Sequence, residues 1–264
     1  MRSCRNGSSI DISINLHPHW EANNDNDNWA TEAAAILETH GLVALKSSSK
    51  NEGLIKQEIC DGANEAAFTR VKEMHRRIES RGLDPLGISF AEVVCRDDGR
   101  RRFDVPLPWI GGGSSGDNIG TPLESTERVA FGSLHDSIGN LVNPMSRQPY
   151  VTAAGLLINM PGSQSQHWHR DGPDEGYIDC FVPLIDLNEG IGPTAIQPNT
   201  HTSTSNAEEA ANGDNILVPL LKKGDALLFD YRTIHRGLGN SSLSAILTLA
   251  YAVFRRKDGC STVD

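Results

Sequence analysis

Two short segments of the chain carry residue types that could bind a metal ion. His169 and Asp171 lie two positions apart within residues 166–172, and His235 follows about sixty positions later within residues 230–237. Two histidines and one carboxylate are the ligands of the facial triad that binds Fe(II) and leaves adjacent coordination positions open. The residue types and their spacing therefore predict a metal site made by His169, Asp171 and His235.

The segments that carry these residues have the composition of strand ends and turns. Residues 166–169 are typical of the end of a strand, and residues 170–176, with a proline and glycines, are typical of a turn. Residues 223–229 begin as a tight turn and continue as a short apolar strand, which leads to His235. Ligands at the ends of rigid elements facing one cavity suit a metal site. A histidine–carboxylate hydrogen-bond network without metal is the alternative.

Composition excludes several classes of protein. The 264 residues carry 24 Lys and Arg against 34 Asp and Glu, a formal net charge of -10, so neither nucleic acid nor an anionic membrane is an expected partner. The cysteines are odd in number, widely spaced and without a C-x-x-C pair, which favours a reducing compartment over a disulfide framework. No secretory signal or membrane-length apolar run is evident. We expect a soluble cytoplasmic protein; its oligomeric state cannot be read from the sequence.

The chain changes character along its length. We expect one domain, residues 1–264, with a flexible lead-in (1–28), a helical and mixed support region (29–145) and a core of strands carrying the metal ligands (146–256). Apolar residues at helical spacing predict the helices of the support region, and short β-type runs between turns predict a sandwich or barrel in the second half. The glycine-rich residues 111–120 have the composition of a mobile loop, with a lid over the site as one interpretation.

Four sequence blocks together resemble a known family. They are Trp168–Gly172, Gly192–His201, Lys223–Asp225 and Asp230–Asn240. In their order and spacing they are similar to the phytanoyl-CoA dioxygenase family of Fe(II)/2-oxoglutarate-dependent oxygenases, and the resemblance extends over nearly the whole chain. It implies a mainly β, α+β fold: a double-stranded β-helix (jelly-roll, cupin-like) core with N-terminal packing helices. It also implies a dioxygenase that uses Fe(II), 2-oxoglutarate and O2.

The resemblance also assigns roles to residues. His169, Asp171 and His235 match the iron ligands, and Asn159 matches a position that binds 2-oxoglutarate in some members. The family usually places an arginine about eleven residues after the distal histidine, where its planar guanidinium pairs with the distal carboxylate of 2-oxoglutarate. Here that position is Ile246.

Two residues are candidates to replace the missing arginine. Arg102 supplies a charge, although a solvated position in a turn is the simpler interpretation of the run Arg100–Arg102. Thr248 supplies a hydroxyl but no charge. Either another group anchors the co-substrate or the co-substrate is not bound in the usual way, and the sequence leaves the anchor unresolved.

The expected substrate is a small metabolite whose C–H bond is oxidised, with hydroxylation, oxidative cyclisation or desaturation as outcomes. An intact Asp171 disfavours halogenation, because halogenases free that position for halide. His167 shares strand parity with His169 and is a candidate substrate contact, as is Arg236 beside the distal histidine. Trp168 is expected to pack away from the site.

Two further alternatives stand beside the oxygenase. One is a catalytically silent β-helix binding protein that lost 2-oxoglutarate, for which Ile246 is the best support. The other is a cupin-type metalloenzyme that uses His167 and His169 with Asp174 or Glu175, although no P-x-G turn precedes His235. We favour the oxygenase because all three metal ligands are present.

Overall fold

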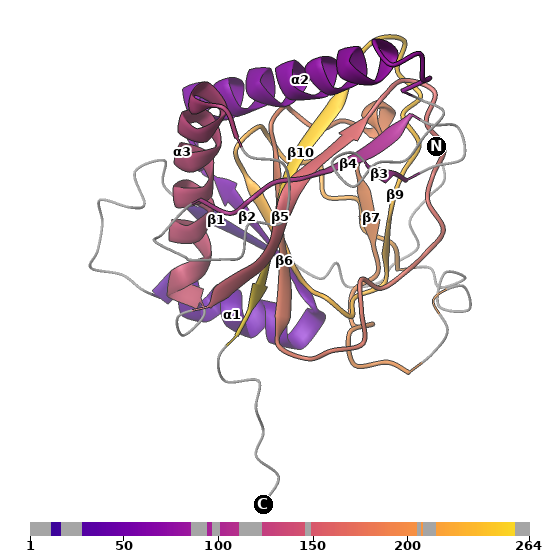
Figure 1. Cartoon of the computed structure of the whole chain (residues 1–264). Helices are drawn as coiled ribbons and strands as arrows, with labels where there is room; N and C mark the ends of the chain where they lie inside the picture. Colours follow the sequence, from indigo (N-terminus) through magenta and orange to yellow (C-terminus); the bar gives the residue numbers. More distant parts are fainter. Residues whose placement is uncertain are drawn as a thin grey trace, which may run out of the picture.

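The computed structural model describes residues 12–16, 28–85, 94–96, 101–110, 123–145, 149–204, 207 and 215–256. Within this part, three α-helices pack on one face of a large sheet, and a small second sheet lies on its other face (Figure 1). The helices are α1 (Asn28–His40), α2 (Gln57–Glu79) and α3 (Ser125–Val142). The residues of the expected lid, 111–120, lie outside the described ranges.

Strands from both halves of the chain form the large sheet. Its eight described strands run in the order β1-β2-β8-β6-β10-β5-β4-β3. They are β1 (Ser13–Leu16), β2 (Leu42–Ser47), β3 (Val94–Cys95), β4 (Arg102–Pro106), β5 (Tyr150–Asn159), β6 (Tyr177–Pro183), β8 (Ala226–Asp230) and β10 (Leu247–Arg255). The small sheet pairs β7 (Thr194–Ile196) with β9 (His235–Gly237) in antiparallel fashion.

The N-terminal segment contributes more than the sequence predicted. Ser13–Leu16 lie within the expected flexible lead-in, but they pair in parallel with β2. The prediction of flexibility is therefore wrong for these four residues. Their alternating pattern, with Ile14 and Leu16 buried, explains why they add an edge strand to the sheet.

Two apolar layers lie on opposite faces of the large sheet. One is between the sheet and the helices and includes Ala250, Ala252 and Phe254 of β10. The other is between the two sheets and includes Leu247 and Leu249 of the same strand. Successive side chains of a strand point to opposite faces, so odd-numbered residues of β10 face the small sheet. The expected class, a mainly β fold with helices packed on one side, is confirmed.

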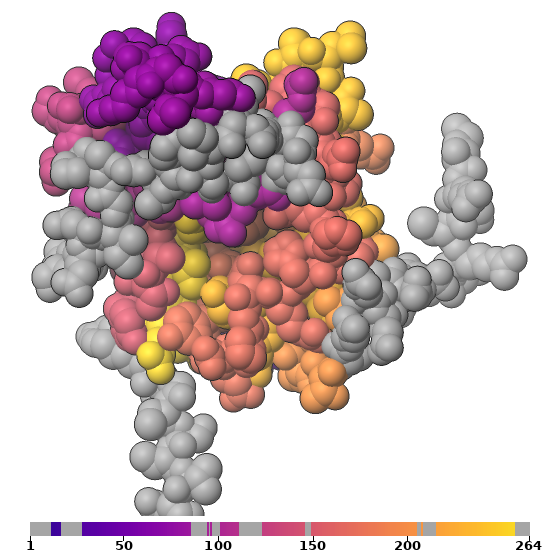
Figure 2. Space-filling view, turned by 45° about the vertical axis from the view of Figure 1, so that its right-hand side comes forward, coloured from indigo at the N-terminus to yellow at the C-terminus, as the bar shows by residue number. Residues whose placement is uncertain are grey.

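The helices are amphipathic and bury one face each. On α2 the buried positions include Cys60, Ala63 and Ala67, at the spacing of one helical face. In the space-filling view, the purple atoms of α2 lie at the upper left, and the lower part of this face is formed mainly by the second half of the chain (Figure 2). No helix in the described ranges is both long and apolar enough to cross a bilayer.

Candidate metal centre and active-site cavity

A backbone bridge places the two histidines of the predicted site side by side. The amide of His169 donates to the carbonyl of His235 at 3.0 Å, and the amide of His235 donates back at 2.9 Å. Directly opposed residues of an antiparallel pair point to the same side, and the centroids of the two imidazole rings lie 4.5 Å apart. The sequence separates these residues, but the backbone pairing fixes them as neighbours.

Each ring is oriented by a carbonyl of its own turn. Nδ1 of His169 lies 2.8 Å from the His167 carbonyl, and Nδ1 of His235 lies 3.0 Å from the Thr233 carbonyl. Because a carbonyl only accepts, each Nδ1 carries the proton and each Nε2 presents a lone pair. Nε2 of His169 and of His235 lie 3.8 and 3.4 Å from the two carboxylate oxygens of Asp171.

The electrostatics of the buried histidine also suit a metal ligand. Burial lowers the pKa of His235, and the nearby His169 lowers it further, while Asp171 acts in the opposite direction. His235 is 4% exposed, so its neutral form is favoured near neutral pH. A neutral imidazole is the form that binds metal.

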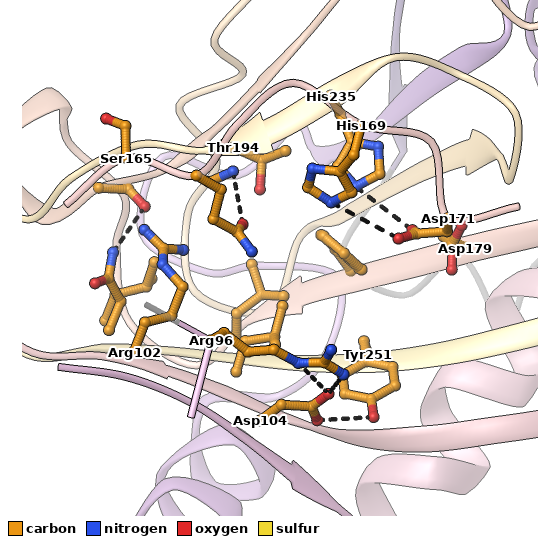
Figure 3. Close-up of a pocket in the computed structure, with 18 of the residues that line it drawn as sticks. Arg96, Arg102, Asp104, Ser165, His169, Asp171, Asp179, Thr194, His235 and Tyr251 are labelled. Carbon is orange, nitrogen blue, oxygen red and sulfur yellow. Dashed lines mark hydrogen bonds and ion pairs between the residues drawn. The ribbon is translucent and has the colours of Figure 1, made fainter. Parts of the chain in front are cut away.

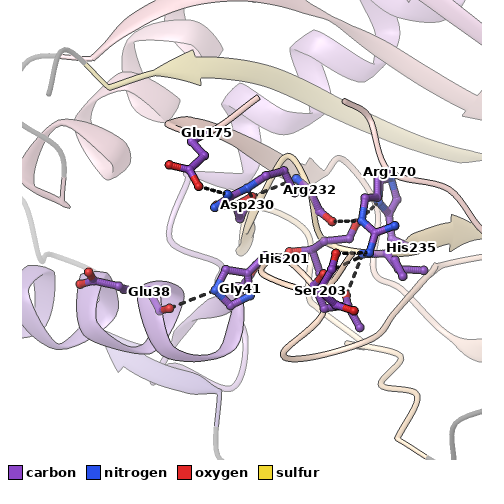
Figure 4. Close-up of polar contacts among 12 residues, drawn as sticks. Glu38, Gly41, Arg170, Glu175, His201, Ser203, Asp230, Arg232 and His235 are labelled. Atoms are coloured by element: carbon purple, nitrogen blue, oxygen red, sulfur yellow. Dashed lines mark hydrogen bonds and ion pairs between the residues drawn. The ribbon is translucent and has the colours of Figure 1, made fainter. Parts of the chain in front are cut away.

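The turns that carry the ligands are tied to one another (Figure 4). Arg170 donates from Nε to the carbonyl of Arg232 at 2.8 Å, and the amide of Asp171 donates to the carbonyl of Tyr231 at 3.1 Å. Arg232 in turn pairs with Asp230 and with Glu175. These contacts hold the Asp171 turn against the loop that precedes His235.

His201 is not part of the group formed by His169, Asp171 and His235. Its Nε2 lies 3.1 Å from the carbonyl of Glu38 in α1 (Figure 4). A Cβ on Gly41 would approach Nδ1 of His201 to 2.5 Å, and Gly41 has a positive φ of 77°. His201 therefore packs the C-terminal end of α1 against the following turn.

The three candidate ligands line a cavity of about 640 Å³ between the two sheets (Figure 3). The His–Asp group occupies one side of the view, Arg102 and Ser165 occupy another, and Arg96, Asp104 and Tyr251 lie along the bottom. Apolar side chains of the large sheet complete the wall; they are Ala153, Leu157, Leu247, Leu249 and Val253. The cavity thus has a mixed lining, in which an apolar part of the large sheet lies beside charged and polar side chains that could orient a small molecule.

Arg102 is a buried cation of the cavity wall, not a solvated residue of a turn. It begins β4 and is 4% exposed, and its Nη2 donates to the carbonyl of Leu238 at 2.5 Å. The register aligns Arg102 with Asn159 of β5, and Asn159 with Leu247 of β10. The simpler interpretation offered by the sequence is wrong because residues 102–106 form a strand with one face toward the cavity.

The first residue of β10 is apolar, whereas Arg102 lies two strands away on β4. Ile246 packs against the helix-side core, and it is Leu247 that faces the cavity. Neither residue is charged. Of the aligned residues Arg102, Asn159 and Leu247, only Arg102 therefore carries a positive charge.

Asn159 lines the cavity, but its side chain is engaged by the protein. Its Nδ2 lies 3.2 to 3.5 Å from the carbonyls of Leu238, Gly192 and Ile191, and its Oδ1 accepts a hydrogen bond from Ser163. These contacts tie β5 to the loops beside β7 and β9. In this conformation its amide contacts backbone carbonyls.

Two predicted contact residues point away from the cavity. Thr248 is fully buried on the helix side of β10, because Leu247 and Leu249 take the cavity side. Arg236 lies between His235 and Gly237 on β9, and its guanidinium stacks 4.5 Å from the ring centroid of Trp168. The strand alternation that brings His235 inward turns Arg236 outward. His167 does line the cavity.

The residues of the cupin-type alternative are not assembled. Within the described part of the chain, the group of three metal-binding side chains consists of His169, Asp171 and His235, whose ligand atoms all lie within 4.8 Å of one another. Glu175 instead pairs with Arg232 at 2.6 Å, with its side chain 77% exposed.

Asp179 is a cavity residue that the sequence analysis missed. It lies on β6, is 2% exposed, and lies close enough to Asp171 to interact with it electrostatically. Burial raises its pKa well above the usual range, and the charges of Asp171 and Asp230 raise it further. The signal in the sequence was a lone carboxyl inside the otherwise largely apolar strand Tyr177–Pro183.

Comparison with known proteins adds independent support for the family. Residues 132–245 match the family described as Phytanoyl-CoA dioxygenase (PhyH). The chain is 28% identical over 105 residues to Dioxygenase hkm4 of Aspergillus hancockii, a match that covers 35% of this chain and 34% of that protein. It is 30% identical over 97 residues to Dioxygenase easH of Epichloe festucae var. lolii, covering 33% of this chain and 52% of that protein. The matches thus span from a third to about half of these relatives.

A solved structure shares the fold over most of the chain. It is the epimerase SnoN in complex with Fe3+, alpha ketoglutarate and nogalamycin RO, with a TM-score of 0.55 and 16% identity, covering 87% of this chain and 84% of that one. At this identity the likeness concerns the fold, a jelly-roll core with packing helices. The matched range 132–245 contains all three candidate ligands. The chain thus matches the phytanoyl-CoA dioxygenase-like family that its motifs predicted.

Proposed function

We propose that the protein is a non-haem Fe(II)/2-oxoglutarate-dependent dioxygenase that oxidises a C–H bond of a small metabolite. The observation that carries this proposal is the convergence of Nε2 of two histidines on the carboxylate of Asp171, inside a cavity that also holds a buried arginine. Neither a binding protein nor a hydrogen-bond network without metal requires that the unprotonated Nε2 atoms of two histidines converge on one carboxylate.

The donor set fits Fe(II). Two neutral imidazoles and one carboxylate are the ligands that this ion takes in oxygenases with open positions. Both rings have the hydrogen bond from Nδ1 to a carbonyl that commonly orients histidine ligands. We assign His169, Asp171 and His235 as the residues that would hold the iron.

Arg102 is our candidate for the group that anchors 2-oxoglutarate. A guanidinium pairs well with a planar carboxylate, and Arg102 is buried in the cavity wall in the same row as Leu247, beside the place where the family arginine is expected. Asn159 would act indirectly, by fixing the backbone around Leu238 whose carbonyl also binds Arg102. Thr248 is buried on the other face of β10 and does not line the cavity.

Held by His169, Asp171 and His235, Fe(II) with 2-oxoglutarate would supply the activation of O2 and the oxidation of the substrate, with succinate and CO2 as the co-products. The chain's own residues would position the reactants. Leu157, Leu249 and Val253 would hold an apolar substrate skeleton against the cavity wall. His167, which lies at the rim, is a candidate substrate contact.

The relatives support a small-molecule substrate without fixing the outcome. The SnoN structure contains Fe3+, alpha ketoglutarate and a nogalamycin compound, and two relatives are named dioxygenases. For this chain we propose hydroxylation, cyclisation or desaturation, carried out by residues 1–264 as a single domain. The silent binding protein is the second candidate; a buried cation at Arg102 weighs against it.

Metal content and co-substrate turnover test the proposal together. The protein is equilibrated anaerobically with Fe(II), its iron is measured, and succinate formed from 2-oxoglutarate on admitting O2 is followed by NMR. Asp171→Ala should lose both the iron and the succinate, whereas Asp174→Ala, an exposed carboxylate on the same turn, should keep both. Equal iron in Asp171→Ala and wild type would contradict the assignment.

A further inference from the structure

A second polar cluster lies on the cavity wall, along the bottom of Figure 3, and the dioxygenase proposal does not use it. Nε and Nη2 of Arg96 donate to Oδ2 of Asp104 at 3.2 and 2.5 Å, and the hydroxyl of Tyr251 donates to Oδ1 at 3.0 Å. The Asp104 side chain is 8% exposed, whereas that of Arg96 is 49% exposed. The buried carboxylate of Asp104 thus binds the Nε–Nη2 edge of the Arg96 guanidinium, and the Nη1 group of Arg96 is directed away from Asp104.

The sheet is built to allow this arrangement. Tyr251 is on β10 and Asp104 on β4, with β5 between them. The Tyr251 ring crosses β5 over Gly155, where a Cβ atom would fall 2.6 Å from the hydroxyl oxygen. Burial raises the pKa of Tyr251, and Asp104 raises it further, so the hydroxyl remains a donor. Asp104 on β4, Tyr251 on β10 and Gly155 on β5 therefore together fix the position of Arg96.

The surroundings of Arg96 limit what it can bind. Its positive charge is already balanced by Asp104, and Asp171 also acts on it electrostatically. A second carboxylate brought into the cavity here would lack a countercharge, which is costly. A neutral oxygen, such as a carbonyl, needs only the N–H groups of the free edge. Across the sheet from Asp104 lie Leu157 and Leu249, which favour an apolar skeleton.

We propose that Arg96, positioned by Asp104 and Tyr251, is a substrate-binding residue that donates to a neutral carbonyl oxygen on an otherwise apolar small molecule. The assignment rests on the proposed function, because it takes the cavity to be the substrate site. An ion pair that only joined β4 to the segment after β3 would not need to face the cavity wall or to be braced by a tyrosine from β10.

Binding of a matched pair of probes to metal-free protein tests the assignment. The probes are 2-naphthamide, which is neutral, and 2-naphthoate, which has the same ring and an anionic group. Affinities are measured by ligand-observed NMR titration for wild type, Arg96→Gln and Tyr251→Phe. Arg76→Gln is the control, because Arg76 also pairs with a carboxylate, Glu73, but lies on the exposed surface of α2. Circular dichroism checks that each variant is folded.

We expect 2-naphthamide to bind more tightly than 2-naphthoate. Arg96→Gln should weaken the amide about tenfold, the usual effect of losing a hydrogen bond to a charged group. Tyr251→Phe should weaken it less, and Arg76→Gln should change nothing. Equal amide affinity in wild type and folded Arg96→Gln, preference for the carboxylate, or no binding of the amide at millimolar concentration would each overturn the assignment.

A second measurement distinguishes failure of the Arg96 assignment from failure of the dioxygenase proposal. The Fe(II)–2-oxoglutarate charge-transfer band is recorded for wild type and for Arg96→Gln under anaerobic conditions. If wild type gives no band but amide binding depends on Arg96, the dioxygenase proposal fails and the subsite stands. If the band is the same in both proteins and amide binding ignores Arg96, the subsite fails and the dioxygenase proposal stands.

Discussion

Arg102 and Gly237 lie so close that a Cβ atom on Gly237 would fall 2.1 Å from Nη1 of Arg102. The strand β9 that carries His235 therefore leaves room, at the second residue after the metal ligand, for a guanidinium from β4. The absence of a side chain at Gly237 therefore allows Arg102, the candidate anchor of 2-oxoglutarate, to pack against the strand that carries the candidate iron ligand His235.

Gly237→Ala should therefore displace Arg102 without removing it. The new methyl group overlaps a flexible side-chain end, so the guanidinium moves and the fold is retained. We expect the Kd for 2-oxoglutarate to rise at least about tenfold, as for loss of a hydrogen bond to a charged group, while Fe(II) affinity changes little. Anaerobic isothermal titration of the metal-free protein with Fe(II), and then of the Fe(II)-loaded protein with 2-oxoglutarate, measures the two affinities. Unchanged 2-oxoglutarate affinity in Gly237→Ala would argue against Arg102 as the anchor.

Asp179 should contribute to iron affinity because its buried carboxyl group lies beside the ligand Asp171 and interacts with it. Asp179→Ala removes the partner of a ligand, and such changes commonly lower metal affinity by about 10- to 100-fold. Asp179→Asn keeps a donor of the same shape and should stay within a few-fold of wild type. Competition with a metal-sensitive dye gives the affinities. A loss of the same size in both variants would mean that Asp179 does not act by orienting Asp171.

His135 should make stability depend on pH. It is 3% exposed in α3, stacks on Trp109 and accepts a hydrogen bond from the Ile110 amide, and burial lowers its pKa from 6.5 to about 4. Between pH 6.5 and 4 the unfolded chain binds a proton that the folded chain does not, so stability falls as the pH falls. From pH 6.5 to pH 5 the loss should be about 2 kcal/mol.

Urea unfolding at pH 7 and pH 5 checks this expectation. In His135→Gln the part of the pH dependence due to His135 should disappear, although stability at pH 7 is lower. The control is His40→Gln, at the partly exposed end of α1, which should keep the wild-type difference between the two pH values. An unaltered pH dependence in His135→Gln would show that another group is responsible.

The ion pair between Arg70 of α2 and Glu127 of α3 should hold these helices in register. Its atoms lie 3.0 Å apart with side chains 6% and 9% exposed. Glu127→Leu leaves a buried guanidinium facing an apolar group and should cost about 3 to 5 kcal/mol of unfolding free energy. The double variant Arg70→Leu/Glu127→Leu should regain most of that loss. Chemical denaturation measures it, and equal losses in the single and double variants would contradict the prediction.

The sequence predicted the parts of the fold that follow from local patterns. The apolar stripe of α2 and the alternation in the second half gave the helices and strands, and the motif around His169 and Asp171 gave the candidate ligands. Strand parity alone indicated that His167 and His169 share a face and that Trp168 points away. These features depend on neighbours within a few residues, so no long-range contact is needed to predict them.

What the sequence did not predict depends on pairing between distant strands. Thr248 was a candidate anchor because it supplies a hydroxyl group, but the register of β10 places Leu247 and Leu249 toward the cavity. Arg102 was expected in solvent because its pairing with Asn159 is not visible in the chain. The cluster of Arg96, Asp104 and Tyr251 likewise forms only when three strands of different sequence position come together.

The most direct test of the central claim is an anaerobic titration of metal-free protein, first with Fe(II) and then with 2-oxoglutarate, monitored by visible absorbance. We predict the weak charge-transfer band of the iron–2-oxoglutarate chelate in wild type. It should be absent in His169→Ala at every concentration, and in Arg102→Gln it should be shifted to about 10- to 100-fold higher 2-oxoglutarate. Wild-type protein that binds iron but gives no band, or that binds no iron, would contradict the account.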